Sequence, residues 1–131
     1  MKDLLSDDFQ KTVSECTIRH RSILNILAKH QEAAGRVNRA VCKAATSCGC
    51  IGIQAHKPEI PEDISLHQLP QFMSSHVQGE LCEDCQETLE AEIGLHFFYL
   101  AALCNTFDLK INDIMLKERM KLLALGVYNM S

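Results

Sequence analysis

Four of the seven cysteines lie in two close pairs that a long segment separates. Cys48 and Cys50 flank a glycine, and Cys82 and Cys85 form a CxxC pair beyond residues 51–81. Two ligands close together on each of two segments lower the entropic cost of assembling a tetrahedral thiolate site. A CxxC pair at a helix start suits this role, because residues i and i+3 share a face and the helix N-terminus favours the thiolate. The spacing therefore predicts a structural metal site, with zinc as the expected ion.

Other chemistry fits the same cysteines. An iron–sulfur centre uses the same ligands, and four ordinary thiols near loop ends need no metal at all. A CxxC pair at a helix start is also typical of redox dithiols, although the βαβ context of that class is absent here. His56, His67 and His76 lie between the two pairs, where each is either a replacement for a thiolate ligand or a solvent-exposed loop residue.

Charge and composition limit the classes of partner. The net charge of -4 argues against a nucleic-acid surface built on bulk charge. No run approaches the roughly 18 apolar residues of a membrane span, and residues 1–10 lack the basic flank and apolar run of a signal peptide. An odd number of cysteines favours buried thiols or metal ligands in a reducing compartment over disulfides. We therefore expect a cytoplasmic protein with no membrane or nucleic-acid partner.

Helical periodicity organises most of the chain around the cysteine pairs. Apolar residues recur in steps of three and four over about 7–47, which predicts one long helix after Ser6, or two helices with a break near His30. The same pattern predicts helices over about 79–105 and 111–125, the last ended by Gly126. No strand pattern of period two is seen. The sequence thus predicts an all-α bundle, a single domain over 1–131.

The connection over about 48–78 holds all three prolines and interrupts the helices. We expect it to be irregular, with one short helix over about 64–73. Connections of this length in compact domains are uncommon, and a metal ion that holds both ends would explain this one.

The helix predicted over 79–105 is apolar on nearly every side beyond Ile93. Such a helix is buried between other helices or at a subunit interface. One small bundle offers too few neighbours to cover it. We therefore expect a homodimer or a higher homo-oligomer.

Two segments resemble the MazG-like family of all-α nucleoside triphosphate pyrophosphohydrolases. Residues 90–122, EAEIGLHFFYLAALCNTFDLKINDIMLKERMKL, are similar to the C-terminal half of that family through EIG and FYLAAL. Residues 32–41, EAAGRVNRAV, match an earlier family helix more weakly, at Glu32, Gly35, Ala40 and Val41. The resemblance covers the long helices and leaves out the connection with its cysteines. It implies a MazG-like helical bundle.

The resemblance also implies a reaction. In the family, an EExxE motif on one helix and an ExxD motif on another hold Mg²⁺ for attack of water on a nucleoside triphosphate, which releases pyrophosphate. This chain keeps Glu32 and Glu92 but has Ala33, Arg36 and Leu95 at the other acidic positions. Glu32 and Glu92 are then the residual catalytic residues of a divergent enzyme with weak, altered or lost activity, which would use Mg²⁺ and a nucleotide ligand.

A second hypothesis needs no catalysis. The missing acids favour a binding or regulatory module that combines the helical scaffold with the four-cysteine metal site. At i and i+4, Glu32 and Arg36 then form a simple ion pair on one helix.

Overall fold

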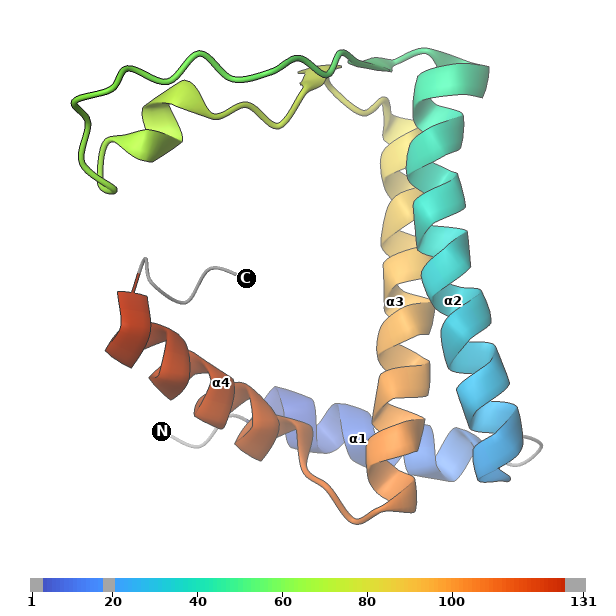
Figure 1. Cartoon of the computed structure of the whole chain (residues 1–131). Coiled ribbons are helices and arrows are strands. Elements are labelled where there is room, and N and C mark those ends of the chain that lie inside the picture. Colours follow the sequence, from blue (N-terminus) through green and yellow to red (C-terminus); the bar gives the residue numbers. More distant parts are fainter. Residues whose placement is uncertain (1–3, 18–20, 127–131) are drawn as a thin grey trace.

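Helices make up 69% of the computed structural model, which describes residues 4–17 and 21–126 (Figure 1). The helices are α1 (Leu4–Cys16), α2 (Ile23–Lys43), α3 (Glu83–Thr106) and α4 (Ile111–Leu125). This confirms the all-α prediction. In the part of the chain that the structure describes, no helix is long and apolar enough to cross a membrane.

The centre of the fold is the pair of helices α2 and α3, which lie side by side along their lengths (Figure 1). Helix α1 crosses one end of this pair, and the core forms there from small and branched side chains. Its buried members are Val13, Ile26, Ala101 and Ala102. The alanines let the helix backbones approach closely, so this end of the pair is the tightly packed one.

The first helical region is broken at a different place from the one that the sequence predicts. Helix α1 ends at Cys16 and α2 begins at Ile23, so His30 lies inside α2. Ser22 is the N-cap of α2, because its Oγ accepts a hydrogen bond from the Leu24 N–H at 3.3 Å. Ser6 lies within α1 rather than before it. The predicted break near His30 was therefore wrong. The second helix begins where it does because Ser22 caps it.

The connection contains a small sheet that the sequence does not predict. Strands β1 (Ile51–Ile53) and β2 (Val77–Gly79) pair antiparallel, with Ile51 opposite Gly79. Three residues are too few for an alternating pattern to stand out, which is why the expectation of no strands was wrong. A 3₁₀-helix, η2 (Leu69–Phe72), lies within the range expected for a short helix.

The turn between α3 and α4 is held by one side chain of α1. The Gln10 amide nitrogen donates to the Asn105 side-chain oxygen at 3.0 Å and to the Leu109 carbonyl at 2.9 Å. The Gln10 amide oxygen accepts from the Ile111 N–H at 2.7 Å, so it caps the first turn of α4. With this turn held, α4 and the connection extend from opposite ends of the α2–α3 pair toward the same side, and the molecule has an open, C-like shape (Figure 1).

Candidate metal centre

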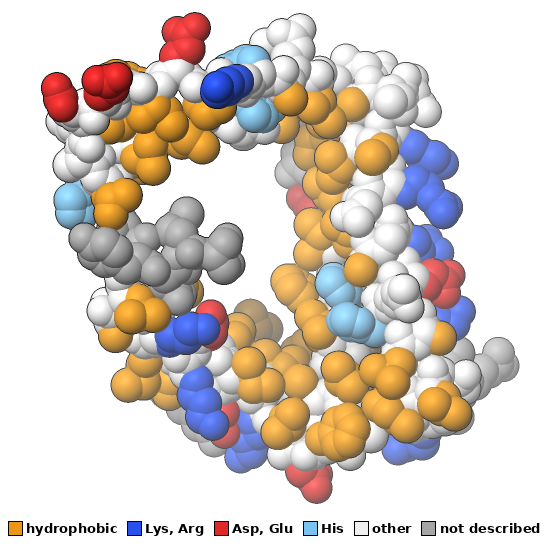
Figure 2. Space-filling model, viewed as in Figure 1, with side chains coloured by type: hydrophobic (Ala, Val, Ile, Leu, Met, Phe, Trp, Pro, Cys, Tyr) orange, Lys and Arg blue, Asp and Glu red, His pale blue; other side chains and the backbone are white. Residues whose placement is uncertain are grey.

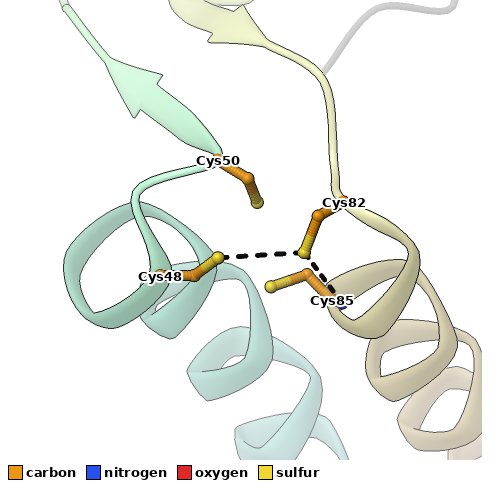
Figure 3. Close-up of side chains that lie close together, drawn as sticks. All are labelled: Cys48, Cys50, Cys82 and Cys85. Carbon is orange, nitrogen blue, oxygen red and sulfur yellow. Dashed lines mark hydrogen bonds between the residues drawn. The ribbon is translucent and has the colours of Figure 1, made fainter.

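The four cysteines that the sequence pairs come together where α2 ends and α3 begins (Figure 3). Their sulfur atoms all lie within 4.8 Å of one another, and the Cys48 and Cys82 sulfurs are 3.8 Å apart. A tetrahedral site with metal–sulfur distances near 2.3 Å has sulfur–sulfur edges of about 3.8 Å. All four are free thiols, since a disulfide requires about 2.05 Å. The cluster is therefore close enough to hold one metal ion.

The CGC pair is positioned by a change of helix type. The last turn after α2, Ala44–Cys48 (η1), is a π-helix, and Gly49 follows in the left-handed region with φ 83°. The Gly49 N–H donates to the Ala44 carbonyl at 2.8 Å, which closes the turn. This reversal lets the Cys48 and Cys50 side chains point toward the start of α3 (Figure 3). π-helical turns are frequent at functional sites.

The CxxC pair is positioned by the start of α3. Cys82 is the N-cap of this helix, and its sulfur accepts a hydrogen bond from the Cys85 N–H at 3.4 Å. That hydrogen bond is the main reason why the pKa of Cys82 is lowered. Cys85 lies in the first turn of α3, three residues after Cys82 and on the same face of the helix. The helix N-terminus thus favours the thiolate at Cys82, as the spacing predicts.

Two other thiols of the cluster, Cys85 and Cys48, have a raised pKa. The hydrogen bond with Cys82 raises the pKa of Cys85 strongly, and desolvation adds to this effect. For Cys48, the Cys50 N–H lowers the pKa, but the contact with Cys82 and desolvation outweigh it, so the net direction is upward. Several thiolates this close repel one another, and a bound divalent cation removes that repulsion. The cluster is chemically suited to a metal ion.

The sheet brings the two halves of the cluster together. Gly79 has φ 83°, and a Cβ atom at this position would lie 2.7 Å from the carbonyl oxygen of Cys50. Only glycine allows β2 to approach the CGC segment this closely. The sequence analysis missed Gly79 and both strands. The one sequence signal for the role of Gly79 was its position three residues before Cys82, the first cysteine of the CxxC pair.

The histidines of the connection do not join the thiols. Within the described residues the metal-ligand cluster consists of the four cysteines. The rings of His56 and His76 instead pack edge-on, with their centroids 5.1 Å apart. His67 is exposed. The donor set is thus four sulfurs.

The two carboxylates that the resemblance suggests as catalytic residues, Glu32 and Glu92, have separate partners. Arg36 on α2 holds both oxygens of Glu92 on α3, with Nε to Oε2 at 2.5 Å and Nη2 to Oε1 at 3.0 Å. This hydrogen bonding lowers the pKa of Glu92 and raises that of Arg36. Exposed Glu32 pairs with Lys29, at 3.2 Å. The expected Glu32–Arg36 ion pair was therefore wrong, because Arg36 reaches across to the neighbouring helix.

Two of the three positions at which the resembled motif has acids and this chain does not, Ala33 and Leu95, are used for packing. Ala33 is 1% exposed between α2 and its neighbours, and Leu95 is half-buried. A cavity of about 380 Å³ lies elsewhere, by the α3–α4 turn, and includes neither Glu32 nor Glu92. It is lined by Asp7, Gln10, Asn105, Asp108, Leu109 and Lys110.

A histidine pair also joins α2 and α3. The Nε2 atoms of His30 and His96 lie 3.3 Å apart, within hydrogen-bonding distance. No local pattern could have paired them, since they come from helices on either side of the connection.

No protein-family model matches the chain, and neither a curated protein nor a solved structure matches it. We therefore base the inference of function on the geometry of the molecule itself. Two features carry it, the thiol cluster at one end of the α2–α3 pair and the Arg36–Glu92 ion pair between the same helices.

Proposed function

We propose that the protein is a non-catalytic, MazG-like helical module in which zinc bound by Cys48, Cys50, Cys82 and Cys85 holds the connection onto the α2–α3 pair. The observation that carries the proposal is the ion pair between Arg36 and Glu92. It occupies the place where the resemblance to the family implies catalytic Mg²⁺.

Magnesium catalysis is disfavoured by charge and by ligand number. Mg²⁺ requires an octahedron of oxygen ligands, of which carboxylates supply at least one or two. Both oxygens of Glu92 already accept hydrogen bonds from Arg36, and the guanidinium repels a second cation. Glu32 is paired with Lys29 on its own helix. These residues thus fit a structural ion pair better than a magnesium site.

Zinc is the ion that best fits the cluster. Thiolates are soft ligands, and a tetrahedral set of four sulfurs selects zinc or iron. Zinc has no redox chemistry, which suits a structural role with four closed positions. Since free thiolates persist in reducing compartments, we also propose a cytoplasmic location.

The zinc would stabilise the fold by joining its two halves. Ordering residues 51–81 between the cysteine pairs costs conformational entropy. A metal ion bound to both pairs fixes the end of α2 against the start of α3 and so offsets part of that cost. It would also set the register in which Arg36 meets Glu92. We propose that this rigid pair of helices is the scaffold for binding or regulation.

A second candidate is a divergent pyrophosphohydrolase with weak or altered activity. The observation in its favour is that Glu32 and Glu92, the two acids kept from the family motif, lie on the neighbouring helices α2 and α3. A bound nucleotide would then have to displace the guanidinium of Arg36 from Glu92 before Mg²⁺ could bind.

Pyrophosphate release distinguishes the two candidates. The zinc-loaded protein is incubated with each common nucleoside triphosphate and Mg²⁺ or Mn²⁺, beside the matched variant Glu92→Gln. We expect the same background rate from both proteins. Metal-dependent release by the unmodified protein that Glu92→Gln abolishes would overturn the non-catalytic proposal in favour of the second candidate.

A further inference from the structure

Two histidines meet where α2 packs on α3, and we call His30 and His96 the histidine pair. His30 lies on α2, three residues before the buried Ala33, so it belongs to the inward face of that helix. His96 lies on α3, one turn after Glu92, the partner of Arg36. The histidine pair takes no part in that ion pair or in the thiol cluster. It therefore needs an explanation of its own.

The separation of the two rings matches that of two ligands of one metal ion. The two Nε2 atoms are 3.3 Å apart. Two nitrogens bound to one tetrahedral zinc ion at about 2.0–2.1 Å are themselves separated by about 3.3 Å. The ring centroids are 4.9 Å apart, and the ring planes are inclined by 48°. This centroid distance is shorter than that of two rings that point straight at each other with the same nitrogen separation. The rings thus meet at an angle, as two bonds from one ion require.

The histidine pair is partly open to solvent. Both residues are half-buried, and Figure 2 shows histidine side chains at the surface along the α2–α3 pair. An ion can therefore reach the nitrogens and keep water molecules at its remaining positions. Four protein ligands, as in the thiol cluster, suit a structural ion, whereas open positions allow exchange and the binding of a further ligand.

The charges near the histidine pair do not oppose a cation. Among the residues three or four positions away from either histidine on its helix, Glu92 is the charged one. The cation that faces it, Arg36, is neutralised by their ion pair. Lys29, the residue before His30, is paired with Glu32 at 3.2 Å. A divalent ion between the rings thus meets no uncompensated positive charge from these side chains.

We propose that the histidine pair is a second metal site, which binds an exchangeable divalent transition-metal ion through the Nε2 atoms of His30 and His96, with zinc as the expected ion. Imidazole nitrogens suit this class of ion. The site is separate from the thiol cluster, because the chain from His30 to Cys48 is helical and spans roughly 27 Å. Two positions of a tetrahedral ion stay open to water or to an oxygen donor such as a carboxylate or phosphate group. The inference does not depend on zinc in the thiol cluster.

Calorimetric titration of Zn²⁺ into the full chain, as purified and dialysed to remove exchangeable ions, tests the site. We expect the unmodified protein to bind one equivalent through the histidine pair. His30→Gln and His96→Gln keep a side chain that can form a hydrogen bond but remove one of the two ligands. Each should weaken this binding by about tenfold or more. The matched control is His56→Gln in the connection, whose ring also packs on another histidine, His76; it should leave the binding unchanged.

Two results would overturn the proposal. One is dialysed protein that takes up no zinc, and the other is uptake that both His30→Gln and His96→Gln retain in full, since it would then come from other ligands. Nuclear magnetic resonance of the unmodified protein gives an answer even where a variant fails to fold. The imidazole resonances of His30 and His96 should shift as Zn²⁺ is added, and unchanged resonances would contradict the site.

Discussion

Arg36 and Glu92 form a forked ion pair that joins α2 to α3 through two hydrogen bonds, one to each carboxylate oxygen. The two residues lie on opposite sides of the connection in sequence. A fork of this kind fixes the relative position of the two groups as well as their separation. The pair therefore reports on the register of the two helices.

The ion pair makes stability depend on pH in a defined direction. The pKa of Glu92 is lowered by Arg36 in the folded protein. The stability that Glu92 contributes is therefore fully present above the pKa of an unfolded glutamate, about 4.3, and is lost as the pH falls through the lower folded value. We expect the urea midpoint of the unmodified protein to exceed that of Glu92→Gln at neutral pH and the two to converge in acid.

The matched control for this prediction is Glu32→Gln, at the exposed pair with Lys29. Exposed pairs contribute little, so its midpoint should follow that of the unmodified protein. Release of a bound metal ion in acid affects the unmodified protein, Glu92→Gln and Glu32→Gln equally, so it cancels when their urea midpoints are compared. A gap between the unmodified protein and Glu92→Gln that stays constant from neutral pH into acid would contradict the assigned role of Arg36.

Removal of the metal should destabilise the protein strongly. We expect one zinc per chain by elemental analysis, and a loss of about 3 kcal/mol or more on chelation, which lowers the Tm by about 10 °C in a chain of this size. Cys85→Ser should reproduce the effect. The matched control is Cys42→Ser, at an exposed cysteine outside the cluster, which should retain the metal and the Tm. Protein free of zinc and iron, with a Tm that a chelator leaves unchanged, would refute the site.

The cysteine cluster was predictable because its geometry follows from local rules. Cys82 and Cys85 share a helix face at any N-terminus, and a glycine between Cys48 and Cys50 permits a tight reversal. The sequence does not show directly that the two pairs lie together in the fold, but four cysteines in two close pairs favour a shared metal site. The all-α class followed equally from periodicity.

The partner of Arg36 was not predictable from one sequence. Local spacing offered Glu32 one turn away, whereas the real partner depends on how α2 and α3 align after the connection closes. The start of α2 was missed for a related reason, since the periodic pattern passes smoothly through Ser22 and only the capping bond marks the boundary. The spacing of apolar residues does not predict how two helices align in the fold or where a single hydrogen bond caps a helix.

Gly79 should be essential to the metal centre. A Cβ atom at this position would meet the Cys50 carbonyl oxygen at 2.7 Å, and φ is 83°. We expect Gly79→Ala to lower the free energy of unfolding by about 1–3 kcal/mol and zinc affinity by about tenfold or more, since it displaces the backbone of Cys50, a ligand of the site. Chemical denaturation and competition with a zinc chelator measure the two effects.

The matched control is Gly52→Ala in β1. A Cβ there meets nothing within 4 Å, and the backbone is not in the left-handed region. Zinc affinity should stay close to that of the unmodified protein. If Gly79→Ala and Gly52→Ala behave alike, close approach of β2 is not what positions Cys50.

Gln10 should be the residue that fixes the direction of α4. It is 8% exposed and satisfies both the Leu109 carbonyl and the Ile111 N–H. Gln10→Met keeps the volume but leaves these buried groups without a partner, which should cost about 1–3 kcal/mol in a urea titration. Gln31→Met, at an exposed position of α2, is the control and should cost little. Equal urea midpoints for Gln10→Met and Gln31→Met would contradict this role of Gln10.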